Sequence, residues 1–127
     1  MVQGVANLLY LWIPMAAELS VEVGNCWRLL GQYHPAADCA EAAVSEFRER
    51  LPRSAQFNRI HAADAYLGMG ELEQALDSAG TAIPMAKALS SARSIEFIQA
   101  FAARLEPYGT TVAVREFRDR LHAELAA

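Results

Sequence analysis

Apolar and small residues recur along the chain at the three- and four-residue spacing of an amphipathic helix. The first such segment runs from Glu18 to Gly31, where glycine interrupts the pattern. A second runs from Pro35 to Arg50, and a proline suits the first turn of a helix. Leu51 precedes a proline and therefore avoids the α region. These features predict two consecutive helices over residues 18–51.

The same pattern returns further along the chain. A helix is expected from about Ser54 to Gly68, followed by a glycine-rich turn and a second helix from Leu72 to about Leu89. Pro84 lies inside that second helix, where it removes one hydrogen bond and crowds the carbonyl of Gly80. Because glycine adapts most easily, we expect a kink at this point and a helix that continues.

A third pair of helices is predicted over residues 91–126. A turn at Pro107-Tyr108-Gly109 divides it, and Thr110 or Thr111 can cap the last helix. No segment shows the two-residue alternation and β-branched enrichment of a strand. The sequence therefore predicts an all-α protein.

An internal repeat relates the first two pairs. Gly31 and Gly70 are 39 positions apart, and at this offset Trp27 lies on Tyr66. Small residues of the two second helices also coincide, and these pairs are Ala36 with Ala75, Ala40 with Ala79 and Ala43 with Ala82. Glycine suits the turn, and small residues at helical spacing let two helix backbones approach closely.

These features resemble the tetratricopeptide pattern, whose repeat is about 34 residues long. The longer offset departs from that pattern, and the connection over residues 48–55 accommodates the extra positions. The resemblance implies a single domain over residues 1–127, built as a tetratricopeptide-like stack of about six or seven antiparallel helices. Its parts are an apolar helix and three hairpins, over residues 1–17, 18–51, 54–89 and 91–126.

A second resemblance covers residues 15–125. The order CWRLLGQYHPAADCAEAAV, RSAQFNRIHAADAYLGMGELEQAL and SARSIEFIQAFAARLEPYGTTVAVREFRDRL resembles the C-terminal region of actinobacterial helix-turn-helix transcriptional regulators. It implies a ligand- or partner-sensing domain that often dimerises and that usually follows a DNA-binding domain. This chain lacks such a DNA-binding domain, so it is either a fragment or a stand-alone relative.

In tetratricopeptide proteins the first helix of each hairpin lines a groove. Carried over to this sequence, the resemblance implies a groove that takes a peptide, a protein or a small ligand. Within it, Asn25 can bond a peptide backbone through its donor and its acceptor, and Arg28 can clamp a carboxylate. The alternative is that these are ordinary solvated side chains. The expected groove residues are Glu18, Val21, Asn25, Arg28, Phe57, Ile60, Asp64 and Leu67.

Residues 1–17 carry no charged side chain. A signal peptide would need a basic leader, and a membrane span needs about 20 apolar residues without polar interruptions. The open end of a helical repeat exposes an apolar face that needs a cover. We therefore expect a homodimer contact at this end, made by Leu8, Leu9, Tyr10 and Trp12.

The charge of the chain and the motifs that it lacks argue against binding of nucleic acid, metal or cofactor. The net charge is −4, without the basic run that contacts to nucleic acid phosphates require. The two cysteines, Cys26 and Cys39, indicate free thiols in a reducing cytoplasm. The histidines are scattered, so we expect no metal, and no cofactor motif is present.

Motifs of nucleophilic or metal-dependent catalysis are missing as well. The sequence therefore favours a sensing or dimerisation module of a transcriptional regulator over an enzyme. A structural dimerisation or adaptor protein without a ligand is the alternative, and a small helical enzyme ranks third.

Overall fold

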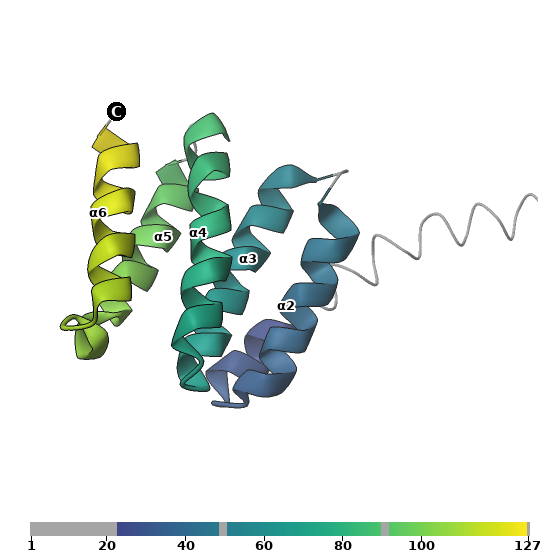
Figure 1. The fold of residues 1–127 in the computed structure, drawn as a ribbon. Helices are drawn as coiled ribbons and strands as arrows, with labels where there is room; N and C mark the ends of the chain where they lie inside the picture. The colour runs from purple at the N-terminus through teal and green to yellow at the C-terminus, as the bar shows by residue number, and fades with distance from the viewer. Residues whose placement is uncertain (1–22, 49–50, 90–91, 127) are drawn as a thin grey trace, which may run out of the picture.

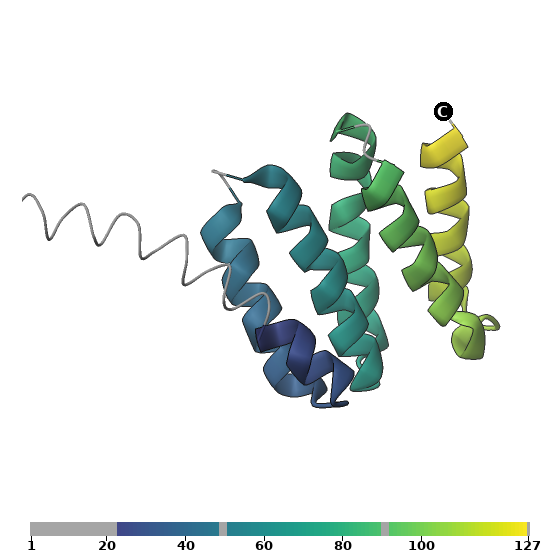
Figure 2. The same ribbon diagram turned by 180° about the vertical axis from the view of Figure 1, so that it is seen from behind.

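The computed structural model describes residues 23–48, 51–89 and 92–126. Its helices run side by side, each antiparallel to the next (Figures 1 and 2). After a helical segment over residues 23–29, the chain forms α2 (Tyr33–Phe47), α3 (Pro52–Gly68), α4 (Leu72–Leu89), α5 (Ala92–Arg104), a short 3-10 helix η1 (Glu106–Tyr108) and α6 (Val112–Ala126). The described part of the chain contains no strand, and the predicted all-α stack of helical hairpins is confirmed.

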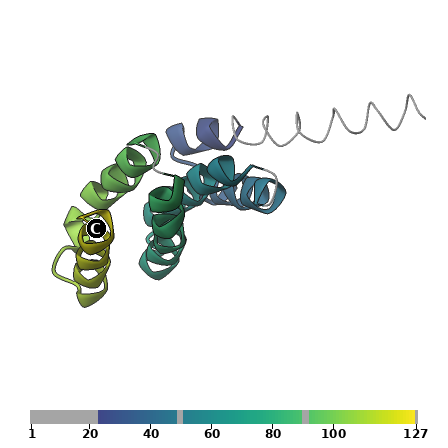
Figure 3. The same ribbon diagram turned by 90° about the horizontal axis from the view of Figure 1, so that it is seen from above.

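The helices form two layers. Seen from above, residues 23–29, α3 and α5 lie along one side, and α2, α4 and α6 lie along the other (Figure 3). Each pair thus contributes its first helix to one face and its second helix to the opposite face. None of the described helices is both long and apolar enough to span a membrane.

The predicted repeat is visible in the two turns that contain Gly31 and Gly70. Their φ angles are 75° and 80°, in the left-handed region that glycine adopts without strain. Their hydrogen bonds also match at the 39-residue offset and form the same helix-ending motif. The amides of Gly31 and Gly70 donate to the carbonyls of Arg28 and Leu67 at 3.0 Å, and those of Gln32 and Glu71 donate to Trp27 and Tyr66 at 2.8 and 2.9 Å.

The helices α2 and α3 each begin two residues before the predicted position, and each has a proline in its first turn. The helix α3 begins at Pro52, two residues before the expected Ser54. Proline at the first position costs nothing because that amide has no partner within the helix. The helix α2 begins at Tyr33, so Pro35 is its third residue and still lies in the first turn.

Later elements follow the prediction closely. The helix α4 runs through Pro84 to Leu89. Thr111 caps α6, because its hydroxyl accepts a hydrogen bond from the amide of Val114 at 3.4 Å and donates to the carbonyl of Tyr108 at 2.8 Å.

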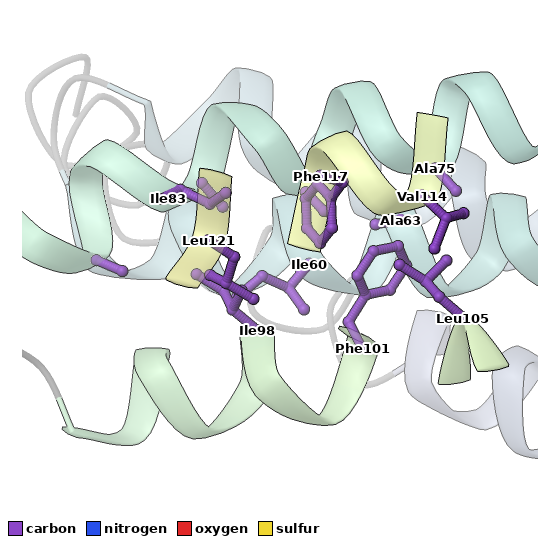
Figure 4. Packing of buried hydrophobic residues seen from close by; sticks show 13 residues of the cluster. Ile60, Ala63, Ala75, Ile83, Ile98, Phe101, Leu105, Val114, Phe117 and Leu121 are labelled. Atoms are coloured by element: carbon purple, nitrogen blue, oxygen red, sulfur yellow. The ribbon is translucent and has the colours of Figure 1, made fainter. Parts of the chain in front are cut away.

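The main core lies among α3, α4, α5 and α6 (Figure 4). Its centre is aromatic, with the rings of Phe101 and Phe117 edge to face at 5.8 Å between centroids. The α2–α3 contact is made largely by small side chains instead, in clusters that contain Ala43, Phe47 and Ala55 and then Ala36, Ala37 and Ala65. Small side chains thus line much of the α2–α3 interface, and the rings of Phe101 and Phe117 meet between α5 and α6.

Candidate functional site

A hollow of about 470 Å³ lies on the face formed by the first helices. We call it the three-helix groove. Residues 23–29, α3 and the end of α5 supply most of its walls, which are Arg28, Tyr33, Asp64, Leu67, Gly68, Ala103, Arg104 and Pro107. Hollows of this volume hold small ligands or short peptide segments.

Gly68 lets α2 reach the groove. A Cβ atom built on Gly68 would lie 2.6 Å from the Tyr33 ring, closer than real side chains approach. The absence of a side chain therefore allows the tyrosine to lie flat against the end of α3.

An ion pair joins two walls of the groove. Nε of Arg104 donates to Oδ1 of Asp64 at 2.9 Å, and Nη2 donates to the same oxygen. The Asp64 side chain is only 10% exposed, which strengthens the pair relative to one in open solvent. The pair fixes the end of α5 against α3, and both of these bonds use one carboxylate oxygen.

Arg28 stands at the junction between the groove and a second, water-sized cavity of about 10 Å³. The small cavity is lined by Gly24, Asn25, Arg28, Ala36, Ala40, Asn58 and His61. Among the described residues, neither Nε of Arg28 nor Nδ1 of His61 has a hydrogen-bond partner, although both atoms are buried. Buried polar atoms of this kind favour a water or a ligand atom between them.

Aromatic side chains continue the face beyond the groove. The rings of Phe57 and Phe97 are edge to face at 5.3 Å, and His61 meets Phe97 in the same way at 5.8 Å. The guanidinium of Arg93 lies 5.3 Å from the centre of the Phe57 ring, within cation–π range.

The charge of this region is opposite in sign to the net charge of the chain. Burial lowers the pKa of His61, and nearby Arg28, Arg104 and Arg93 lower it further, while Asp64 acts in the opposite direction. Three cations thus surround a neutral imidazole, with one carboxylate among them. A locally positive face on a protein of net charge −4 favours an anionic ligand.

The lowered pKa of His61 predicts a pH-dependent stability. The unfolded chain binds a proton near pH 6.5, whereas the folded chain binds it only at lower pH. Between these values the unfolded state holds more protons, so the free energy of unfolding contributed by this group is complete above about pH 7 and is lost as the pH falls.

Urea unfolding of the native chain and of His61→Gln from pH 8 to pH 5 measures this contribution as the difference between the two proteins. We expect that difference to shift toward lower stability of the native chain below about pH 6.5. Val112→Ala, which removes an exposed apolar side chain and no titratable group, should keep the pH dependence of the native chain. A difference that stays constant over the range would contradict the assignment.

The predicted groove residues do not all lie together. Arg28, Asp64 and Leu67 line the three-helix groove, and Asn25 lines the small cavity beside it. Phe57 belongs to the aromatic cluster. Glu18 and Val21 fall outside the described residues, as do residues 1–17 and the predicted dimer contacts Leu8, Leu9, Tyr10 and Trp12.

Ile60 requires a correction. Its side chain is 0% exposed and belongs to the main core, so it does not face the groove. The reason is that α3 contacts α4 and α5 as well as α2. Ile60 packs with side chains of α4, α5 and α6 in the main core.

Arg104 was not among the predicted site residues. The prediction stopped at the second hairpin, although α5 is the first helix of the third. Arg28, Leu67 and Arg104 each lie three positions before a turn residue, which is Gly31, Gly70 and Pro107 respectively. Extending the same rule by one hairpin would have found it.

In the part of the chain that the structure describes, no three side chains from His, Cys, Asp and Glu gather in one place. His61 and Asp64 lie one helical turn apart, and Asp64 bonds Arg104. The charged groups of the groove are the guanidinium groups of Arg28 and Arg104 and the carboxylate of Asp64, whose Oδ1 accepts from Arg104.

The chain matches no family model, no curated protein and no solved structure. The candidate function therefore rests on these side chains and their arrangement.

Proposed function

We propose that this chain is a binding domain of regulatory type, and that its ligand is a carboxylate-bearing peptide or small molecule held in the three-helix groove. The observation that carries the proposal is the meeting of Arg28, Asp64 and Arg104 around one hollow of about 470 Å³. Two guanidinium groups and one carboxylate leave an excess of positive charge for an anion.

The roles of the three side chains follow from their pairing. Arg104 is occupied by Asp64, so its function is to position the wall. Nε of Arg28 is buried and has no acceptor among the described residues. Arg28 also lines the groove, and in this proposal its guanidinium meets the ligand carboxylate. The second oxygen of Asp64 is then the acceptor for an N–H of the ligand.

This arrangement suits recognition rather than catalysis. A planar guanidinium orients a carboxylate, and Leu67 and Tyr33 supply apolar contact beside it. We assign the domain to sensing within a transcriptional regulator of the cytoplasm, in line with the sequence resemblance, with no direct contact to nucleic acid.

A screen of matched peptide pairs tests whether the ligand must carry a carboxylate. The probes are acetylated hexapeptides with a free C-terminal carboxylate, each matched with its C-terminal amide, and binding is followed by thermal shift and then by titration. Ligands that bind only the folded state raise the midpoint. We expect the acids to bind about tenfold or more tightly than their amides, as expected for a charge-assisted hydrogen bond. Equal affinity of acid and amide throughout the set would refute the carboxylate assignment.

A further inference from the structure

The contact between residues 23–29 and α3 contains the small cavity of about 10 Å³, and both elements contribute polar side chains to it. Arg28 comes from the first helical segment and His61 from α3, and we call this contact the Arg28–His61 seam. Nε of Arg28 and Nδ1 of His61 are buried, and neither atom has a hydrogen-bond partner among the described residues. Because a buried polar atom without a partner costs free energy, the seam is stable only where these two groups suit each other.

The two protonation states of His61 differ in what they offer to Arg28. A neutral imidazole accepts at one ring nitrogen, so Nδ1 can receive the hydrogen bond that Nε of Arg28 donates, directly or through one water of the cavity. An imidazolium donates from both ring nitrogens and accepts from neither. Protonation of His61 therefore removes the acceptor and places a second cation beside the guanidinium.

The other charged groups around His61 add to this repulsion more than they offset it. The helix α5 supplies two cations, Arg93 and Arg104. Asp64, on α3 itself, is a carboxylate, and it bonds Arg104. From α2, two alanines line the cavity, and they carry no charge. Burial and the surrounding arginines keep the pKa of His61 below its ordinary value, so the imidazole is neutral at neutral pH.

The segment over residues 23–29 is attached to the stack over a small area. Among the described residues 23–30, only Gly24 is buried. A Cβ atom built on Gly24 would lie 2.9 Å from Cβ of Cys39, so the backbone of the segment lies directly against α2 at this point. The side chains of Trp27, Leu29 and Leu30 are exposed. Segments with few buried contacts open at the lowest free energy, so weakening of the seam releases this segment first.

We infer that the Arg28–His61 seam is a pH-sensitive switch, in which protonation of His61 releases residues 23–29 from α3 while the remaining helices stay folded. The main core lies among α3, α4, α5 and α6 and does not include this segment. Because Arg28 also lines the three-helix groove, release removes part of the groove wall. The switch operates in the chain without a ligand, so the inference is independent of the proposed function.

Amide hydrogen exchange of the full chain at about pH 7.5 and pH 5.5, corrected for the intrinsic effect of pH on exchange, measures the release. A released helix of this length is unstable in water, so its amides lose their protection. In the released state His61 has the ordinary pKa of about 6.5, and one such group can raise the population of this state at most about tenfold between the two pH values. We expect protection over residues 27–32 to fall about threefold to tenfold.

Three substitutions separate the switch from a general effect of acid. His61→Gln stays neutral at both pH values and keeps an acceptor, so the fall in protection should disappear. Arg28→Gln removes the guanidinium that faces His61 and should reduce the fall. His122→Gln is the matched control, because it removes a histidine of α6 that does not line the small cavity, and it should leave the fall unchanged.

Low concentrations of urea show whether the opening is local. Exchange over residues 27–32 should change little with urea because local release exposes little surface, whereas exchange of the buried amides of α4 should accelerate. Equal protection at the two pH values, a fall that persists in His61→Gln, or a urea dependence of the segment equal to that of α4 would each overturn the inference.

Discussion

Replacing Phe101 by alanine is expected to lower the free energy of unfolding by about 3–5 kcal/mol. The ring is 0% exposed, lies edge to face with Phe117, and belongs to the main core with side chains from α3 and α4. Truncation removes both the transfer free energy of the ring and the contacts around the cavity that it leaves. Because domains of this size are stable by about 5–15 kcal/mol, the loss is a large part of the total.

Urea unfolding measures this effect. Phe101→Leu keeps most of the volume and should cost much less, while Val112→Ala removes an exposed apolar side chain and should stay within about 0.5 kcal/mol of the native value. A change below about 1 kcal/mol for Phe101→Ala would mean that the core is not arranged as described.

Replacing Arg28 by alanine should weaken binding of a carboxylate ligand about tenfold to a hundredfold, the range of one hydrogen bond to a charged group. Arg28 is the groove guanidinium whose buried Nε has no acceptor among the described residues, whereas Arg104 bonds Asp64. Arg28→Lys keeps the charge but loses the planar pair of donors, so it should bind with intermediate affinity.

Isothermal titration gives these affinities. Arg115→Ala is the matched control, since it removes the same charge from an exposed position on α6 outside both cavities. Equal weakening by the two alanine variants would indicate a general charge effect and would remove Arg28 from the site.

Local signals in the sequence were enough to predict most of the fold. The turns at Gly31 and Gly70, the cap at Thr111 and the continuity of α4 through Pro84 depend on residues within a few positions of each other. Pro52 predicts the end of the preceding helix, and the structure shows that it is also the first residue of α3.

The candidate site was harder to predict because it depends on how hairpins meet. Buried positions occur around much of α3 and include the polar residues Gln56 and Asn58. Gln56 is buried because Nε2 donates to the carbonyl of Ala82 in α4 at 3.1 Å, a contact between residues far apart in the chain. For the same reason, helical periodicity could not distinguish Ile60 in the core from Asp64 in the groove.

The pairing of Asp64 with Arg104 spans 40 positions and has no local signal. It gives Arg104 a partner on α3 and holds this side chain in the wall of the groove. The sequence predicts that Arg28 can clamp a carboxylate, and the structure places Arg28 and Arg104 in the walls of one hollow.

The central claim is that a ligand carboxylate meets Arg28, and a double-mutant cycle tests it most directly. Four titrations combine the native chain and Arg28→Ala with one peptide acid and its amide. We predict that the native chain prefers the acid about tenfold or more, and that Arg28→Ala binds acid and amide equally. A preference for the acid that persists undiminished in Arg28→Ala would show that the carboxylate binds elsewhere and would contradict the account.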